Sequence, residues 1–128
     1  MSELADTRVE DRARITEALY HYCRAIDRIR PEALFNCFHG DAIIDNGQGL
    51  FEVSAFATMV VKRHTAIPQA FHMIGNILID FTGADTAFVE SYCLAMEHHP
   101  ATAQGQALDR IVRVRYADQF QCRDGEWK

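Results

Sequence analysis

Two residues, Asp27 and His72, have the side chains that acid–base catalysis requires. An imidazole takes up and releases protons near neutral pH. A carboxylate that meets it fixes the imidazole tautomer and stabilises the imidazolium formed when a proton is abstracted. Tyr22 lies five residues before Asp27 in the same helical stretch, where its phenol offers a hydrogen-bond donor or a weak acid. Asp27, His72 and Tyr22 are therefore the candidate catalytic residues.

Both members of this pair also fit a purely structural interpretation. Arg24 and Arg30 lie three residues before and after Asp27, which is the spacing of an ordinary ion pair on a helix surface. A histidine such as His72, in a partly buried strand, is often a hydrogen-bonded core residue. The spacing alone leaves both interpretations open.

The stretch around His72 reads as a strand, and alternation along it predicts which side chains share a face. Residues 71–81 alternate so that His72, Ile74 and Asn76 point the same way. Polar groups beside apolar ones are typical of a lined pocket. We expect the substrate-binding side chains to be Asn76, Ile74, Tyr92, Phe56 and Met59.

The remaining elements follow from periodicity and from turn signals. Apolar residues at spacings of three and four predict a long first helix, which a Thr7–Glu10 capping box begins and Pro31 ends. Ser54 is the expected cap of a third helix. The predicted elements are helices over 31–38 and 55–64, a hairpin around 46–47, long strands over 71–81, 86–98 and 107–121, and a short strand from 126.

Composition excludes several classes of protein. The chain of 128 residues carries 13 basic and 18 acidic side chains, a net charge of −5, which argues against a nucleic-acid binder or a polybasic membrane surface. It contains no apolar stretch long enough to span a membrane, and its first residues are too polar for a signal peptide. Four widely spaced cysteines without a C-x-x-C pair are typical of a reduced, cytoplasmic protein. We expect one domain over residues 1–128.

Motifs for cofactor or metal chemistry are missing from the sequence. The six histidines show no metal-ligand spacing, and there is no phosphate-binding glycine loop and no G-x-S-x-G elbow. We therefore expect neither a metal nor a cofactor.

Several short motifs, taken in order, carry a resemblance to a known superfamily. They are Y-C-R-A-I-D over 22–27, Asp41 with Asn46–Gly47, H-x-x-x-N over 72–76, R-Y-x-D-x-F over 115–120, and D-G-x-W over 124–127. Together they resemble the nuclear-transport-factor-2-like superfamily, in its polyketide cyclase-like (SnoaL-like), scytalone dehydratase-like and dehydrochlorinase-like branch. The resemblance implies an α+β fold in which about three helices wrap a cone-shaped, curved, mixed or antiparallel sheet around an apolar pocket, a cystatin-like roll.

The resemblance also implies a chemistry. In lyases of this branch an aspartate and a histidine matching Asp27 and His72 form a catalytic dyad, with histidine as general base. Bile-acid dehydratase-like members have a tyrosine five residues before this aspartate, as Tyr22 lies five residues before Asp27. The implied function is a cofactor-free lyase or isomerase, a dehydratase or related elimination enzyme, acting on a small hydrophobic or polycyclic substrate. The alternative is a non-catalytic ligand-binding or assembly module, like the small subunit of a ring-hydroxylating dioxygenase.

Two further expectations concern the sheet. Its convex face should carry Met73, Ile77 and Ile79, which predicts a homo-oligomer, a dimer or a trimer. Members of the branch carry a pocket arginine or another pocket group on the final strand, beyond the D-G-x-W motif. The chain ends at Lys128, so we expect that strand to be truncated.

Overall fold

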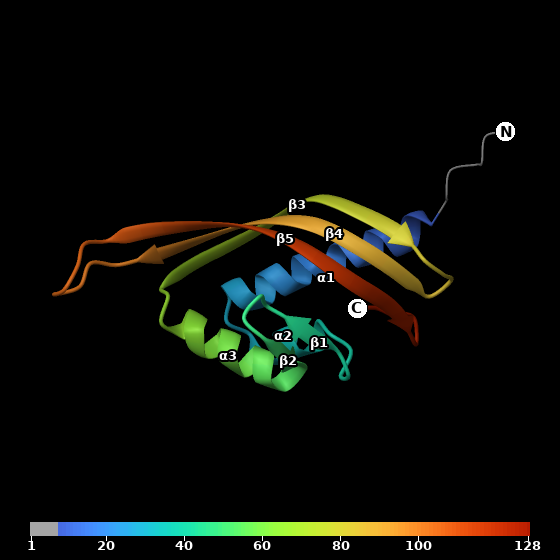
Figure 1. Ribbon diagram of the computed structural model, residues 1–128, viewed down its shortest axis with the longest axis horizontal. Coiled ribbons are helices and arrows are strands. Elements are labelled where there is room, and N and C mark those ends of the chain that lie inside the picture. The colour runs from blue at the N-terminus through green and yellow to red at the C-terminus, as the bar shows by residue number, and fades with distance from the viewer. Residues whose placement is uncertain (1–7) are drawn as a thin grey trace.

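The computed structural model describes residues 8–128, in which helices precede a long antiparallel sheet (Figure 1). The elements are α1 (Val9–Asp27), α2 (Pro31–Asn36), β1 (Ile43–Asp45), β2 (Leu50–Glu52), α3 (Val53–Thr65), β3 (Gln69–Phe81), β4 (Thr86–His99), β5 (Leu108–Arg123) and β6 (Glu126–Trp127). The predicted order of helices, hairpin and long strands is confirmed.

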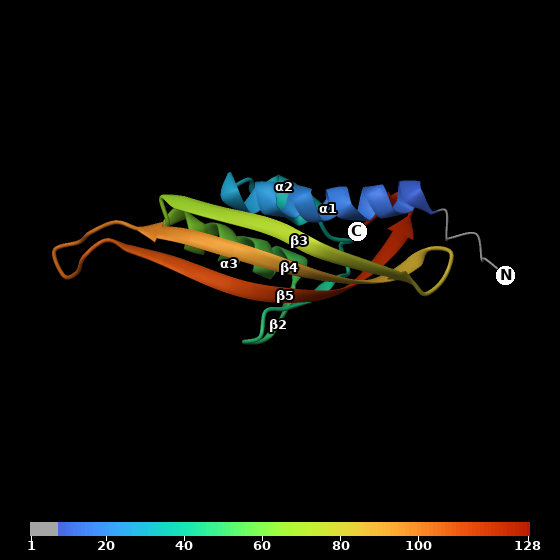
Figure 2. The same cartoon turned by 90° about the horizontal axis from the view of Figure 1, so that it is seen from above.

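The sheet and the helices form two layers. Strands run in the order β3-β4-β5-β6, each antiparallel to its neighbour, while β1 and β2 pair separately. Figures 1 and 2 show the sheet arching over α2, α3 and the β1–β2 hairpin, with α1 running beside β3. The predicted α+β class with a curved sheet is confirmed, and its sheet is antiparallel throughout.

Two clusters of buried side chains hold the elements together. Under the first half of α1, Ile15 and Leu19 pack against Val89 of β4 and Phe120 of β5. Burying such side chains contributes about 1.5–3 kcal/mol each. The second cluster lies among the helices and comprises Ala25, Ile26, Leu34, Phe56, Ala57 and Val60. The first cluster fixes α1 on the inner face of the sheet, and the second holds α2 and α3 against the end of α1.

A β-bulge in β3 corrects one sequence prediction. Gly75 pairs with Tyr92 and Leu78 pairs with Glu90, so two residues of β3 oppose the single residue between their partners on β4. The first of the two, Asn76, has a φ of 52°, a left-handed conformation that asparagine tolerates better than most residues.

The bulge inverts the inside–outside alternation of β3. His72 and Ile74 face the helices before it, whereas Asn76 is exposed and Ile77 and Ile79 face the helices after it. The prediction that Asn76 shares the face of His72 is therefore wrong. So is the placement of Ile77 and Ile79 on the convex face, where of the three expected residues only Met73 lies, 51% exposed.

The end of α1 is held by its own backbone. The N–H of Ile29 donates to Ile26 (3.0 Å) and that of Arg30 donates to Ala25 (2.9 Å), the pattern of a Schellman motif. Ile29 occupies the left-handed position with a φ of 50°, which a β-branched residue adopts only at a cost. This turn ends α1 at Asp27.

Helix starts differ from the predicted caps. Ser54 lies inside the first turn of α3, whose N-cap is Glu52 without a side-chain hydrogen bond. Thr7 of the predicted capping box lies outside the described residues. No helix within residues 8–128 combines the length and the apolar character needed to cross a membrane.

Candidate functional site

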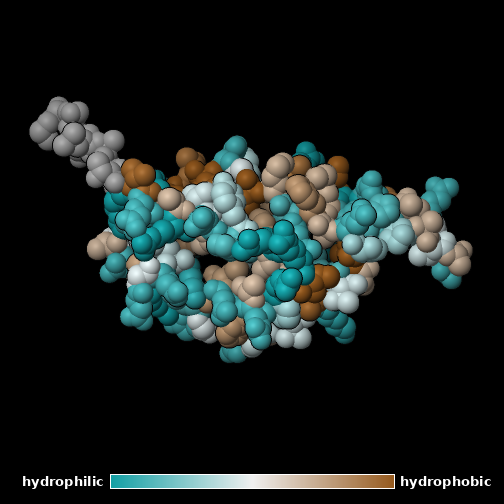
Figure 3. Space-filling view, turned by 180° about the vertical axis from the view of Figure 1, so that it is seen from behind, coloured by the Kyte–Doolittle hydropathy of each residue, from teal (hydrophilic) through white to brown (hydrophobic). Residues whose placement is uncertain are grey.

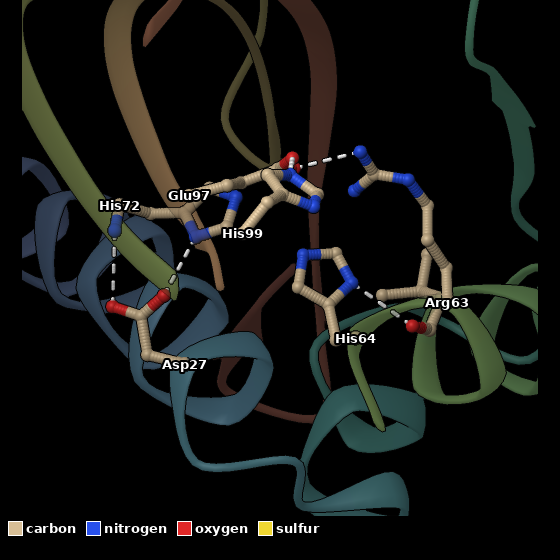
Figure 4. Close-up of polar contacts among 7 residues, drawn as sticks. Asp27, Arg63, His64, His72, Glu97 and His99 are labelled. Carbon is tan, nitrogen blue, oxygen red and sulfur yellow. Dashed lines mark hydrogen bonds and ion pairs between the residues drawn. The ribbon is translucent and has the colours of Figure 1, made fainter. Parts of the chain in front are cut away.

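Asp27 and His72 meet where the end of α1 crosses β3 (Figure 4). The His72 Nδ1 lies 2.6 Å from Asp27 Oδ1, and the His72 backbone N–H donates to Asp27 Oδ2 over 3.0 Å. β3 is an edge strand, so Asp27 takes a backbone donor on the strand's open side. Both carboxylate oxygens are thus held by one residue that lies 45 positions away.

This geometry assigns the imidazole tautomer. A carboxylate only accepts hydrogen bonds, so the ring proton of neutral His72 resides on Nδ1 and donates to Asp27. The lone pair is left on Nε2, where it can take a proton from a bound molecule. About 9% of the His72 side chain and 21% of the Asp27 side chain remain exposed, so the pair is sheltered but accessible.

Arginines flanking Asp27 do not take its carboxylate. Arg24 instead approaches His21, with 3.1 Å between Arg24 Nη2 and His21 Nδ1. Asp27 therefore pairs with His72 and not with an arginine on the helix surface. This is the contact that acid–base chemistry needs.

Tyr22 belongs to an aromatic wall among the helices and β5. Its ring packs edge-on against Phe38 and Tyr116, at centroid distances of 5.9 and 6.1 Å, and Phe38 packs in turn on Phe56 at 5.9 Å. Burial raises the pKa of the Tyr22 phenol far above its usual range, so the group stays protonated and can donate. Met59, a predicted substrate-binding residue, is partly buried against the same helical cluster.

The other predicted binding residues divide between the two faces of the sheet. Ile74 lies on the inner face with His72. Asn76 is exposed at the bulge, away from the dyad. Tyr92 is 44% exposed on the outer face, where the guanidinium of Arg115 lies 5.2 Å above its ring. Alternation along β4 turns Ser91 and Cys93 inward and Tyr92 outward, which corrects the expectation that Tyr92 lines the pocket.

Sequence analysis missed a second buried histidine beside the dyad. The ring of His64, on the last turn of α3, lies 5.6 Å from the ring of His72, and only 6% of the residue is exposed. Its Nδ1 lies 2.9 Å from the carbonyl oxygen of Val60. The predicted helix over 55–64 included His64, but nothing in the spacing of His64 and His72 showed that they meet.

A buried carboxylate, Glu97, lies in the same region of the molecule (Figure 4). Its side chain is 4% exposed, and its oxygens lie 2.7 Å from Arg63 Nη2 and 3.1 Å from His99 Nε2. Burial alone would raise the pKa of Glu97, but these two partners outweigh it and hold the pKa below its usual value. Glu97 is therefore an ionised, fully paired group.

Asp118 is a third residue that sequence reasoning did not select for the site. It lies on the inner face of β5 between Tyr116 and Phe120, and burial raises the pKa of its carboxyl to about 6. The R-Y-x-D-x-F motif contained the signal, because alternation places its tyrosine, aspartate and phenylalanine on one face.

Two open grooves lie elsewhere on the helical side. One of about 960 Å³ runs between α1, α2 and the C-terminal residues, and basic side chains line much of it: Arg14, Arg24, Arg28, Arg30 and Lys128. Figure 3 shows the hollow on this face, bordered mainly by hydrophilic side chains. Another groove of about 730 Å³ separates α2 from α3. Neither groove is lined by the dyad, and no three His, Cys, Asp or Glu side chains among residues 8–128 are placed to hold a metal ion.

Comparisons with known proteins agree with the fold of the chain. Residues 7–128 match the SnoaL-like domain family. Among curated proteins, none matches the chain. A solved structure of a scytalone dehydratase-like protein from Novosphingobium aromaticivorans DSM 12444 is 26% identical, with a TM-score of 0.83 over 96% of this chain and 81% of that one.

Two further solved structures share the fold at lower identity. A hexachlorocyclohexane dehydrochlorinase, LinA-type3, from Novosphingobium barchaimii LL02 is 20% identical, with a TM-score of 0.77 over 94% of this chain and 82% of that one. A protein with a cystatin-like fold from Nostoc punctiforme PCC 73102 is 17% identical, with a TM-score of 0.70 over 93% and 85%.

Proposed function

Because this chain belongs to the SnoaL-like domain family, and because its aspartate and histidine meet in a sheltered site, we propose that it is a cofactor-free lyase or isomerase. His72 is the general base and Asp27 orients it. The observation that carries the proposal is the paired contact of Asp27, with one oxygen 2.6 Å from the imidazole Nδ1 and the other on the backbone N–H of the same residue.

The reaction begins with proton transfer from carbon. His72 Nε2 takes a proton from a C–H bond made acidic by a neighbouring carbonyl or halogen, and Asp27 stabilises the resulting imidazolium. The electron pair of the broken bond forms a carbon–carbon double bond, and a hydroxide or chloride on the adjacent carbon leaves with its own bonding pair. In an isomerisation the same proton returns to another carbon instead.

Tyr22 supplies the hydrogen bond that a leaving hydroxyl needs. Its buried phenol stays protonated, whereas before the proton transfer His72 Nε2 and the Asp27 carboxylate bear only lone pairs. Asn76, which the sequence predicted to bind substrate, faces away from the dyad at the bulge. The leaving oxygen therefore takes its hydrogen bond from the phenol of Tyr22, which lies in the aromatic wall with Phe38, Phe56 and Tyr116.

The substrate class follows from the same surroundings. The last turn of α1, which carries Asp27, packs into a cluster of apolar and aromatic side chains, and such surroundings favour a small hydrophobic or polycyclic molecule. Solved structures with this fold include proteins named for the elimination of water and of hydrogen chloride. We therefore place dehydration and dehydrochlorination of ring compounds first.

Two probes test this proposal directly. Loss of water from 3-hydroxy-1-tetralone gives fluorescent 1-naphthol, and loss of hydrogen chloride from hexachlorocyclohexane releases chloride. We expect wild-type protein to accelerate at least one of these reactions and His72→Gln to lower the rate by about 10²–10⁴-fold. His98→Gln is the matched control, because His98 forms a similar contact with Asp109 (2.7 Å) on an exposed surface. Equal rates in the two variants would rule out His72 as the base.

The outer face of the sheet favours a second candidate, a non-catalytic assembly module. Large apolar side chains exposed on that face include Phe71, Met73, Leu78, Phe88, Tyr92 and Ile111. Such a face is suited to association, and a second copy of this chain would form a homo-oligomer. In sedimentation velocity, Met73→Glu should then reduce the mass of the assembly. An assembly that forms while both probes stay unreacted would favour the module over the lyase.

A further inference from the structure

His64 presents a second imidazole to the region of the dyad. Its ring centroid lies 5.6 Å from that of His72, with 43° between the ring planes. In Figure 4 the nitrogen bonded to Val60 lies on the far side of the ring, and the other nitrogen lies on the side of His72. The free edge of His64 thus faces the proposed site of proton transfer.

The contact with Val60 fixes which nitrogen carries the proton. A carbonyl oxygen only accepts, so Nδ1 of His64 is the protonated nitrogen and Nε2 bears a lone pair. Burial, the largest influence, lowers the pKa of His64, and the charge of Arg63 acts in the same direction, although the bond to Val60 and nearby Glu97 oppose it. His64 is therefore a neutral acceptor at physiological pH.

This acceptor has no hydrogen-bond partner within the described residues, although its Nε2 atom is completely buried. Its neighbours cannot supply one readily. Neutral His72 directs its ring proton to Asp27, so the Nε2 of His72 also bears a lone pair and cannot donate. Glu97 accepts only, and it receives the donors of Arg63 and His99. A buried polar atom without a partner is rare and unfavourable, and a bound water, an ion or a polar group of a ligand can complete it.

We propose that His64 Nε2 accepts a hydrogen bond from a hydroxyl group of the bound molecule, next to the C–H bond that His72 breaks. The position of that C–H bond rests on the proposed function, but the hydroxyl contact does not. A leaving hydroxyl needs a donor, and His64 is an acceptor, so this hydroxyl is one that the product keeps. The substrate or product class is therefore a phenol or enol on a hydrophobic ring system.

Two substitutions separate this role from a structural one. Asn at position 64 places its amide N–H where Nδ1 was, so His64→Asn keeps the bond to Val60 and removes the Nε2 acceptor. Gln is longer and places its amide oxygen near the Nε2 position, so His64→Gln keeps an acceptor and gives up the bond to Val60. If His64 contacts the ligand, His64→Gln should bind a ligand with a hydroxyl group more tightly than His64→Asn does. A purely structural role predicts that the two variants have the same ligand preference.

The probes are 1-naphthol and 1-methoxynaphthalene, which differ in the hydroxyl donor, titrated by fluorescence. We expect wild-type protein to prefer 1-naphthol by about tenfold, the effect of one neutral hydrogen bond. His64→Asn should abolish the preference, and His64→Gln should restore part of it. An unchanged preference in His64→Asn, or no binding of 1-naphthol by wild-type protein, would overturn the proposal.

A measurement on the wild-type protein covers the case in which a variant fails to fold. Nitrogen-15 NMR of the His64 ring should show an unprotonated Nε2 whose resonance moves upfield when 1-naphthol is added and not when 1-methoxynaphthalene is added. A protonated Nε2, or no change with 1-naphthol, would refute the contact.

The proposed function is tested separately, by the turnover of His72→Gln. His72→Gln should lose turnover and keep the preference for 1-naphthol. Turnover that survives in His72→Gln counts against the proposed function alone, and a preference that survives in His64→Asn counts against the hydroxyl contact alone.

Discussion

Replacing Asp27 by asparagine should move the proton of His72 from one ring nitrogen to the other. In the native contact one carboxylate oxygen accepts from the ring Nδ1–H and the other accepts from the backbone N–H of His72. An amide offers one acceptor and one donor. The backbone N–H is a permanent donor, so it must keep the amide oxygen, and the amide nitrogen then faces Nδ1. The ring responds by placing its proton on Nε2.

The size of the effect follows from what the substitution keeps. The 2.6 Å charge-assisted bond, worth about 1.5–3 kcal/mol, becomes a neutral bond worth about 0.5–1.5 kcal/mol. We expect the free energy of unfolding to fall by about 1–2 kcal/mol. The loss of the Nε2 lone pair has a larger consequence for turnover, which should fall by about 10²–10⁴-fold.

Long-range proton–nitrogen NMR at pH 8 reads the tautomer without a substrate. The proton should lie on Nδ1 of His72 in wild-type protein and on Nε2 in Asp27→Asn. Asp109→Asn is the matched control, because Asp109 contacts His98 Nδ1 at 2.7 Å while its side chain is 77% exposed. In Asp109→Asn the free energy of unfolding should change by no more than about 0.5 kcal/mol. A proton found on Nε2 in wild-type protein, or the same tautomer in both proteins, would refute the reasoning.

Substitutions at three further residues test other parts of the structure. Burial raises the pKa of Asp118 from 3.8 to about 6, so its carboxylate destabilises the fold above pH 6 and ceases to do so below about pH 4. Thermal melts should therefore show that Asp118→Asn stabilises by about 2–3 kcal/mol at pH 8 and by little at pH 4; equal shifts at both pH values would contradict this. Asn76→Val should cost about 2 kcal/mol in urea unfolding, because valine resists the φ of 52°, whereas Asn76→Gly should be tolerated. Tyr22→Phe keeps the edge-on packing with Phe38 but lowers dehydration of 3-hydroxy-1-tetralone about tenfold, and an unchanged rate would remove Tyr22 from the mechanism.

Local patterns predicted the elements because each pattern is produced by a few neighbouring residues. Pro31 does begin α2, and the strand predicted over 86–98 matches β4 within a residue. The bulge in β3 escaped prediction because strict alternation assumes an unbroken ladder. Gly75–Asn76 was the available signal, since both residue types tolerate unusual backbone conformations.

Predictions for the candidate site divide in the same way. Asp27 and His72 have chemically suited side chains, and their motifs carried the resemblance, so the sequence by itself determined the fold class and named the pair. Only the tertiary structure decided that they meet, because their contact spans 45 positions and depends on where α1 ends against β3. It also brought His64 beside His72 and turned Asn76 and Tyr92 away. Side-chain identity is local information, whereas contacts between distant segments depend on how helices and sheet pack, which no short stretch of sequence encodes.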